Sequence, residues 1–428
     1  MKNNISNLPP IGTADWTGDE FIIRKFIFDT WREVCERYGY KEYLTPILEK
    51  AEIYRAKSGE DIGGKELLVF RGRAGRELSI RPEMTPSVTR LVSRIFNESP
   101  KPLKLFSIAN FFHNERPQRG RNREFWQLNF DVFGSESIWA DIEILQVALD
   151  IMLAFNPPKN SFTLLLNSRK IIEAFMKEVL QIDPAVNLKF ARILDKKEKL
   201  SLKEFEDNLK NIGIDTEQIK KINLFMDSND LEELTTAIPA LSENEGVKEI
   251  NNIIESLEKM GYGQWVKFKP GVIRGFDYYD GMIFEVFDNN PKNNRSMFGG
   301  GRYNGLAGIF GVNAFPAVGS APGDETMKLF LEEWDLIDKI LKNTKPETYY
   351  FPILNESSYF NVQEIAKVLR KANKRVGVGM KVQKLNKALD YANQKKISRV
   401  IILDENEKDQ GVYKIKDMET GEEKSVTF

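Results

Sequence analysis

The spacing of apolar residues predicts a long helix near the start of the chain and a strand after it. Between residues 17 and 38, the apolar side chains from Phe21 to Cys35 fall at helical spacing. This spacing places them on one face of a helix, which Gly39 would end. Residues 42–48 are rich in β-prone side chains, with Pro46 near their end, and predict the following strand.

Residues 106–133 predict two paired strands joined by a charged loop. The first strand, residues 106–112, is apolar and β-prone, whereas the second, residues 125–133, alternates polar and apolar residues after its first position. Because successive side chains of a strand point to opposite faces, Gln127 and Asp131 share one face and the opposite face is apolar. Polar side chains on a central strand need hydrogen-bond partners, and a ligand is one candidate partner.

The pattern changes twice along the rest of the chain. Residues 176–262 are rich in Lys, Glu, Asp and Asn at helical spacing, and they predict an inserted helical subdomain. After a linker at residues 341–347, strands and helices alternate, which predicts a compact α/β domain with a mixed sheet. We therefore expect an α/β protein whose core consists of residues 1–175 and 263–340, with the insertion at 176–262 and a C-terminal domain at 346–428.

Composition restricts the possible functions. The 428 residues include 62 Lys and Arg and 63 Asp and Glu, a net charge of −1, so nucleic acid would have to bind at local basic patches. The single cysteine excludes an internal disulfide and a cysteine-based zinc site, and the single histidine excludes a His-rich metal site. The N-terminus lacks a signal-peptide core and no run of about 18 apolar residues occurs, so we expect a cytoplasmic protein without a membrane span.

The loop between the paired strands carries a dense group of cations. Arg116, Arg119, Arg121 and Arg123 lie within eight residues, with a proline and a glycine to turn the chain. Guanidinium groups suit a polyanion such as a triphosphate or an RNA backbone. A solvated surface loop explains the same charges, and the charges alone do not decide between the two.

Polar side chains also gather where a strand is expected to lead into a helix. In the segment RPEMT at residues 81–85, Glu83 and Thr85 supply a carboxylate and a hydroxyl that suit an ammonium group. Thr85 followed by a proline is equally typical of a helix N-cap, for a helix expected over residues 86–96. Both interpretations stand, since one hydroxyl can serve both purposes.

A third candidate segment, VIRGFDYYDG at residues 272–281, combines an arginine, a glycine and two tyrosines. The glycine beside Arg274 would let a ligand approach closely. In an extended backbone Tyr278 and Tyr279 point to opposite faces, so one would pack and the other would face a pocket. A turn with packed aromatic side chains explains them as well. The glycines at 299–301 would let a strand lie against a flat ligand, and a flexible turn is an equal explanation.

The sequence resembles the class II aminoacyl-tRNA synthetases, and among them the histidyl-tRNA synthetase family. ERPQRGRNREFWQ, residues 115–127, resembles motif 2 of that family, and RPEMT resembles its RPEGT segment. RGFDYY, residues 274–279, closely resembles its histidine-specific signature RGLDYY, and GGGRYN, residues 299–304, resembles GGGRYD. These motifs occur in the family's order.

The resemblance extends over nearly the whole chain and implies a fold. Residues 17–48 resemble motif 1, which builds the dimer interface in the family, and residues 317–336 resemble motif 3, with a helix expected over 327–336. The implied core is a mixed antiparallel sheet flanked by helices. The helical insertion would lie near the acceptor arm of tRNA, and the C-terminal α/β domain would bind the anticodon.

The resemblance also implies site residues and partners. The implied histidine-binding residues are Glu83, Thr85, Gln127, Asp131, Tyr278 and Tyr279. The implied catalytic residues are Glu115, Arg121 and Arg274, which also bind ATP together with Gly301, and Arg116 and Gln118 would meet the acceptor end of tRNA. Histidine, ATP, tRNA(His) and a second copy of the chain are the implied partners. Mg²⁺ would bridge the ATP phosphates, and no metal site on the protein itself is expected.

Two positions depart from the family pattern. His113 stands where motif 2 has an arginine that contacts both substrates, and Thr326 stands where motif 3 has an arginine that contacts the γ-phosphate. Smaller departures are Met84 for glycine, Asn304 for aspartate, and Asp131 where relatives often have glutamate.

These departures leave two hypotheses. The lost cations favour a non-catalytic paralogue that senses histidine as a regulatory subunit of histidine biosynthesis. The signature containing Arg274 and the complete C-terminal domain favour histidine–tRNA ligase, our first hypothesis.

Overall fold

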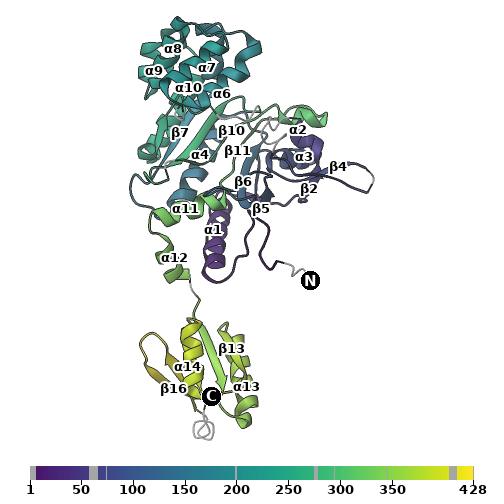
Figure 1. The fold of residues 1–428 in the computed structure, drawn as a ribbon, viewed down its shortest axis with the longest axis vertical. Coiled ribbons are helices and arrows are strands. Elements are labelled where there is room, and N and C mark those ends of the chain that lie inside the picture. The colour runs from purple at the N-terminus through teal and green to yellow at the C-terminus, as the bar shows by residue number, and fades with distance from the viewer. Residues whose placement is uncertain are drawn as a thin grey trace. The chain divides into compact units, whose positions relative to one another are not determined.

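The computed structural model describes most of the chain. The described residues are 6–56, 66–73, 75–197, 200–273, 278–293, 295–344, 346–403 and 412–427. The chain forms two compact units, Met1–Leu341 and Lys342–Phe428 (Figure 1). No helix among the described residues combines the length and the apolar character needed to cross a lipid bilayer.

An eight-stranded sheet forms the centre of the first unit, in the order β1-β5-β6-β11-β10-β9-β7-β8. Its strands are β1 (Lys41–Glu42), β5 (Leu103–Phe112), β6 (Glu124–Phe133), β7 (Phe162–Ser168), β8 (Val266–Phe268), β9 (Met282–Asp288), β10 (Arg295–Arg302) and β11 (Ala317–Ser320). Only the two edge pairs, β1 with β5 and β7 with β8, are parallel. The predicted mixed antiparallel sheet is confirmed.

The β5–β6 hairpin confirms the pattern of alternating side chains. Leu128, Phe130 and Val132 are buried in the main apolar core. The polar residues between them point to the other face, where Asp131 lies opposite Gly319 of β11. The predicted polar face therefore lies along a central strand of the sheet.

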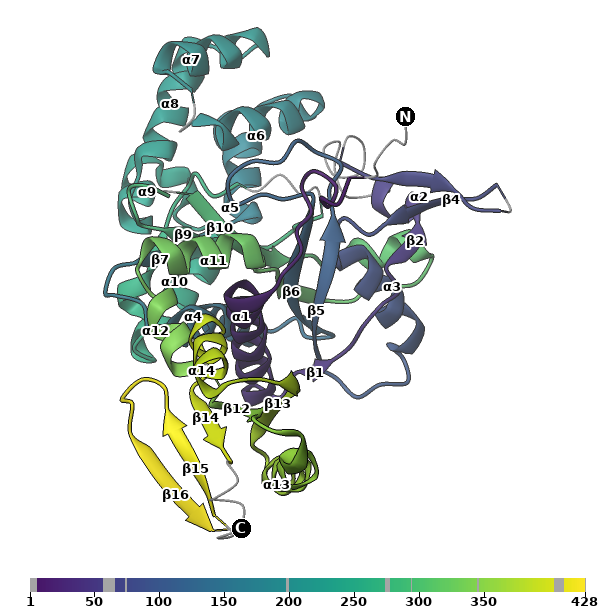
Figure 2. The ribbon, with the colours of Figure 1, turned by 60° about the horizontal axis from the view of Figure 1, so that its bottom comes forward.

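Three helices pack side by side against the apolar face of the sheet: α1 (Gly18–Arg37), α4 (Ile138–Leu153) and α11 (Asp324–Glu333) (Figure 2). The fully buried side chains of α1 include Ile27 and Trp31. The predicted start of α11 at residue 327 is wrong, because the helix starts three residues earlier, at Asp324. Two acidic residues in that first turn suit the positive end of the helix dipole.

Another group of elements lies next to the sheet: α2 (Ala51–Arg55), α3 (Thr85–Ile95) and a three-stranded sheet in the order β2-β4-β3 (Figure 2). Its strands are β2 (Leu48–Lys50), β3 (Val69–Arg71) and β4 (Glu77–Ile80). The prediction of a single strand over residues 42–48 is wrong, since β1 joins the large sheet and β2 joins the small one. Pro46, between them, has no N–H for a sheet hydrogen bond.

Residues 169–259 are mostly helical. The helices are α5 (Arg169–Ala174), a π-helical turn Phe175–Val179, α6 (Asn187–Asp195), α7 (Leu202–Asn211), α8 (Thr216–Asp227), α9 (Leu231–Ala237) and α10 (Glu245–Lys259). Capping boxes start α7 and α8. Helix α10 packs on α4, α5 and β7, and so joins this region to the large sheet (Figure 1). That the region is a separate domain stays a prediction.

The second unit, with the end of α12 (Ile337–Thr344) leading into it, contains a five-stranded mixed sheet in the order β13-β12-β14-β15-β16. Its elements are β12 (Thr348–Ile353), α13 (Tyr359–Lys371), β13 (Arg375–Val382), α14 (Leu385–Gln394), β14 (Arg399–Ile402), β15 (Val412–Asp417) and β16 (Glu423–Thr427). The expected alternation of strands and helices is confirmed. The sequence did not predict β16, because this mostly exposed strand is polar and takes its form from pairing with β15.

Candidate active site

A cavity of about 330 Å³ lies beside β6, β10 and β11. Its lining includes all six residues predicted to bind histidine: Glu83, Thr85, Gln127, Asp131, Tyr278 and Tyr279. They come from the residues before and at the start of α3, from β6 and from the segment before β9, which are far apart in sequence. The fold thus brings the six together at one site.

Asp131 supplies a buried hydrogen-bond acceptor to this cavity. Its Oδ1 accepts a hydrogen bond of 2.6 Å from the hydroxyl of Tyr303, whereas its buried Oδ2 has no hydrogen-bond partner among the described residues. Burial raises the pKa of Asp131 to about 7, although the Tyr303 hydroxyl opposes the shift. A ligand N–H would satisfy the second oxygen.

Gly319 makes room for this carboxylate. A Cβ atom at residue 319 would lie 1.9 Å from Asp131 Oδ1 and 2.9 Å from the carbonyl oxygen of Phe130. Any side chain at this position of β11 would therefore displace the acceptor. The glycine is a requirement of the cavity itself.

A second acidic group lies in the same cavity. Glu83 is 8% exposed, and its Oε2 accepts a hydrogen bond of 3.2 Å from the hydroxyl of Tyr278. The interpretation of Thr85 as an N-cap is wrong: Met84 holds the cap position of α3, Thr85 is the first helical residue, and no side chain caps the helix. The Thr85 side chain lines the cavity beside Glu83.

Gln127 and Tyr279 complete the lining from two sides. Gln127 Nε2 donates a hydrogen bond of 3.3 Å to the carbonyl oxygen of Ala321. Tyr279 lies over Gly301, where a Cβ atom would come within 2.9 Å of the tyrosine ring. Gly301 belongs to the buried part of β10 and lies outside the linings of this cavity and of the larger groove described next, so its assignment to ATP stays a prediction.

A groove of about 1130 Å³ adjoins the small cavity. The two share Arg121, Gln127, Ser296, Met297 and Ala321, so they are continuous. The groove is lined by more cations than carboxylates: Arg119, Arg121, Lys267, Lys269 and Arg295 against Asp195, Glu285 and Glu325. A small polar cavity that opens into a cationic groove is suited to an amino acid beside a polyphosphate.

The predicted ATP-binding residues Glu115 and Arg121 meet at the wall of this groove. Arg121 pairs with Glu115 and, at 3.1 Å, with Glu66. Burial alone would raise the pKa of Glu115, but hydrogen bonds and charge from His113 and Arg121 hold that pKa below its usual range. Glu115 is therefore held in its ionised form beside Arg121.

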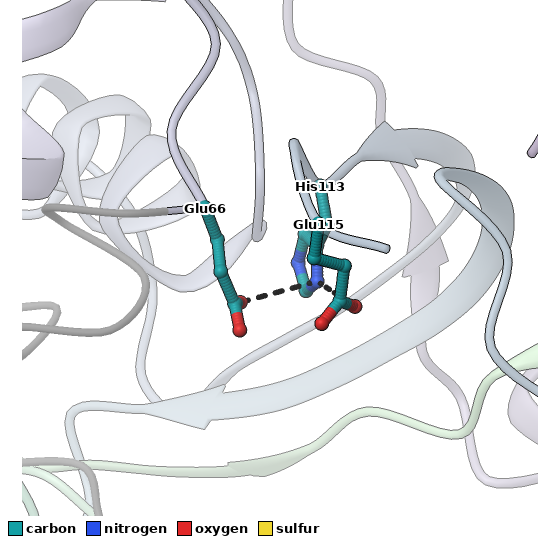
Figure 3. A group of neighbouring side chains, drawn as sticks. All are labelled: Glu66, His113 and Glu115. Carbon is teal, nitrogen blue, oxygen red and sulfur yellow. Dashed lines mark ion pairs between the residues drawn. The ribbon is translucent and has the colours of Figure 1, made fainter. Parts of the chain in front are cut away.

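His113 lies between these two carboxylates (Figure 3). Its Nδ1 is 3.3 Å from Glu66 Oε2 and 3.5 Å from Glu115 Oε1, and its Nε2 donates a hydrogen bond of 2.9 Å to the carbonyl oxygen of Pro82. Glu66, His113 and Glu115 are close enough to hold a metal ion, but ion pairs with Arg121 engage both carboxylates. The imidazole ring thus joins the motif-2 segment to the residues before α3.

The remaining predicted residues of this segment lie at the end of the hairpin. Gln118 and Arg121 pair across a tight turn, each N–H donating to the other's carbonyl oxygen at 2.9 Å. Gln118 lines the groove, and Arg116 is exposed. Arg274 lies outside the described residues.

Thr326 lies at the groove but is engaged by the backbone. Its hydroxyl is within hydrogen-bonding distance of the carbonyl oxygens of Met297, at 3.0 Å, and Gly323, at 3.1 Å. Two residues earlier, at the start of α11, the buried Asp324 accepts a hydrogen bond of 2.8 Å from the Trp126 N–H and pairs with Arg24. The start of α11 is therefore fixed by contacts within the protein.

Residues 12–324 match the protein family described as histidyl-tRNA synthetase. The chain belongs to the histidyl-tRNA synthetase family. Residues 351–428 match the family described as anticodon binding domain. These two matches account for both units of the fold.

Individual known proteins are similar to this chain over almost their full length. A histidine–tRNA ligase of Leptospira biflexa is 37% identical, covering 97% of this chain and 94% of the relative. A histidine–tRNA ligase of Pyrococcus furiosus is 36% identical, covering 97% and 95%. The crystal structure of histidyl-tRNA synthetase from Nostoc sp. PCC 7120 has the same fold, with a TM-score of 0.81 at 22% identity over 99% of this chain and 97% of that one.

The sequence did not assign several residues that line the site. Asn129 shares the predicted polar face with Gln127 and Asp131, so the alternation in β6 was a usable signal for it. Tyr303 follows the glycine run, but nothing in the sequence placed its hydroxyl on Asp131. The neighbouring Arg302 is structural, since it forms a buried ion pair with Asp141 at 2.6 Å.

Proposed function

We propose that the protein is a histidine–tRNA ligase that activates histidine with ATP and transfers it to tRNA(His). The observation that carries this proposal is the continuity of the small cavity, lined by Asp131 and Glu83, with the cationic groove. Family membership and the C-terminal match to an anticodon-binding domain support it. The substrates are then histidine, ATP with Mg²⁺, and tRNA(His).

The small cavity would bind histidine through its imidazole ring and through its α-ammonium group. Asp131 Oδ2 accepts an N–H of the imidazole ring, and Tyr279 contacts the ring. Glu83 and Thr85 bind the α-ammonium group, with Gln127 supporting the bound amino acid. The histidine carboxylate then faces the shared boundary of cavity and groove, where the α-phosphorus of ATP must lie.

The first chemical step is an in-line substitution. A histidine carboxylate oxygen attacks the α-phosphorus, the bond to the bridging oxygen breaks, and pyrophosphate leaves. Mg²⁺ bound with ATP would neutralise part of the phosphate charge. Arg121 and Arg274 stabilise the charge that develops on the phosphates, because positioning and cations matter more here than a protein base. Glu115 holds Arg121 in position through their ion pair.

The second step transfers the histidyl group. The terminal ribose hydroxyl of tRNA attacks the acyl carbon of the adenylate, an ester forms, and AMP leaves with the proton passing to solvent or phosphate. Arg116 and Gln118, at the hairpin tip, then contact the acceptor end. We further propose that the chain acts as a homodimer through the motif-1 region, and sedimentation should give a mass of two chains.

The rival function is a histidine-sensing regulatory subunit. One observation favours it: the motif-2 and motif-3 arginine positions hold His113 and Thr326, and the Thr326 hydroxyl is engaged by the backbone. A sensor would keep the histidine cavity without needing ATP. The anticodon-binding match over residues 351–428 favours the ligase.

Histidine-dependent exchange of labelled pyrophosphate into ATP tests the proposal without tRNA. We expect exchange that requires histidine, falls by at least about a hundredfold in Arg274→Ala, and persists in Arg73→Ala. Arg73 is an exposed arginine between β3 and β4 and serves as the matched control. Histidine binding without exchange in the native protein would support the sensor instead.

A further inference from the structure

The cations of the groove differ in what neutralises them. Arg121 pairs with Glu66 and Glu115, and Arg119 pairs with Glu333. These ion pairs use part of the charge that a polyphosphate would otherwise meet. Arg295, half-buried at the start of β10, makes no ion pair with any residue that the structure describes.

Arg295 lies directly against the tip of the arginine-rich hairpin. Its Nη1 donates a hydrogen bond of 2.9 Å to the carbonyl oxygen of Arg119. A Cβ atom at Gly120 would lie 2.9 Å from the same nitrogen. This single contact orients the guanidinium, and its other N–H groups have no partner among the described residues.

The position of Arg295 indicates which phosphates of a bound nucleotide it would meet. Ser296 and Met297 lie on the boundary between cavity and groove, whereas Arg295 lines the groove alone. The α-phosphorus must lie at that boundary, beside the histidine carboxylate. A cation farther along the groove then meets the phosphates that follow the α-phosphate.

The first residues of α11, Asp324 to Thr326, offer no positive charge to the terminal phosphates. Thr326 has no charge, and its hydroxyl contacts the backbone of Met297, two residues along from Arg295. Asp324 and Glu325 there are acidic, and both pair with Arg24. Lys267 and Lys269 also line the groove without an ion pair to the described part of the chain, but Lys267 is exposed on the edge strand β8 and neither lysine presents a planar fork to phosphate.

We infer that Arg295 binds the β- and γ-phosphates of ATP and supplies the cation that Thr326 does not. This inference rests on the proposed function, since it assigns the groove to ATP. It makes β10 part of the nucleotide site, and it explains how the groove keeps a terminal-phosphate contact without an arginine at position 326.

Calorimetric titration of Arg295→Gln with MgATP and with AMP tests the inference, because AMP lacks both terminal phosphates. We expect ATP affinity to fall by about 10- to 100-fold while AMP affinity changes less than about twofold, the loss expected for a charge-assisted contact to phosphate. Arg94→Gln, on the exposed side of α3, is the matched control and should bind both nucleotides normally.

Arg295→Lys is a second variant that controls for a folding defect, because it keeps the positive charge but loses the planar guanidinium. We expect its ATP affinity to fall less than that of Arg295→Gln, again with little change in AMP affinity. Equal losses of ATP and AMP affinity would show that Arg295 only positions the hairpin, and unchanged ATP affinity would also overturn the inference. If the native protein binds ATP but exchanges no pyrophosphate, the proposed ligase fails while the ATP-versus-AMP comparison still decides the role of Arg295.

Discussion

The Asp131 carboxylate is a buried hydrogen-bond acceptor in the small cavity. It is 3% exposed and receives one hydrogen bond, from Tyr303, so its second oxygen is available to an imidazole N–H. Its raised pKa of about 7 means that the ligand-free protein binds a proton there that the unfolded chain releases near pH 4. The cavity is therefore less stable when the carboxylate is ionised and histidine is absent.

The stability of the fold should depend on the protonation of Asp131. The protonated form stabilises the fold fully below about pH 4, and this contribution is lost as the pH rises through 7. We expect the Tm of Asp131→Asn, relative to the native protein, to rise by several degrees between pH 5 and pH 8. Asp338→Asn, on the exposed side of α12, is the control. A Tm difference that does not vary with pH would contradict this account of Asp131.

Gly319 provides a steric test of the same cavity. Gly319→Ala places a methyl group 1.9 Å from Asp131 Oδ1, so we expect histidine affinity to fall at least about tenfold and stability to fall by ~1–3 kcal/mol. Gly308→Ala should leave both unchanged, because a Cβ atom there meets nothing within 4 Å. Calorimetric titration with histidine measures the first effect, and normal binding by Gly319→Ala would refute the placement of histidine.

Single residues were predictable where a motif or a two-residue period identified them. The six residues predicted to bind histidine line one cavity in the structure, and their individual roles stay predictions. Tyr303 and Arg295 were not predictable as site residues, because only the fold brings Tyr303 to Asp131 and Arg295 to the tip of the hairpin. Thr85 was ambiguous in sequence, since only the backbone shows that Met84 is the cap.

At the scale of elements, one buried ion pair ties three motifs together. Arg24 of α1 pairs with Asp324 and, at 2.8 Å, with Glu325 of α11, while Asp324 accepts the N–H of Trp126 in β6. The motif-1 helix, the motif-2 strand and the motif-3 helix therefore meet at one carboxylate. Burial raises the pKa of Asp324 to about 7, and the charge of Arg24 opposes that shift. Losing the guanidinium would therefore leave a fully buried carboxyl group without its charged partner.

Arg24→Met should therefore destabilise the first unit by ~3–5 kcal/mol. Lys25→Met, its neighbour on α1, breaks only an exposed pair with Asp29 and should cost less than ~1 kcal/mol. Urea unfolding followed by tryptophan fluorescence measures both. Equal effects of the two substitutions would show that the buried pair does not tie the elements together.

Helical spacing and strand alternation predicted most elements of the fold. The misplaced boundaries have physical causes. Residues 42–48 look like one strand, yet the chain passes from one sheet to another around Pro46, and that exchange depends on long-range pairing. Helix α11 starts earlier than the sequence predicted because Asp324 and Glu325 gain a tertiary partner in Arg24.

At the scale of the whole molecule, the two units correspond to two tasks. The first carries the cavity and the groove, and the second matches an anticodon-binding domain. A histidine sensor would use only the first. A ligase needs both, because the same tRNA must be recognised and charged.

Charging of tRNA(His) by the full chain is the most direct test of the ligase. We predict that radiolabelled histidine becomes esterified to tRNA(His) when ATP and Mg²⁺ are present, and that another amino acid in place of histidine gives no charged tRNA. Absence of charging, with histidine binding intact, would contradict the account.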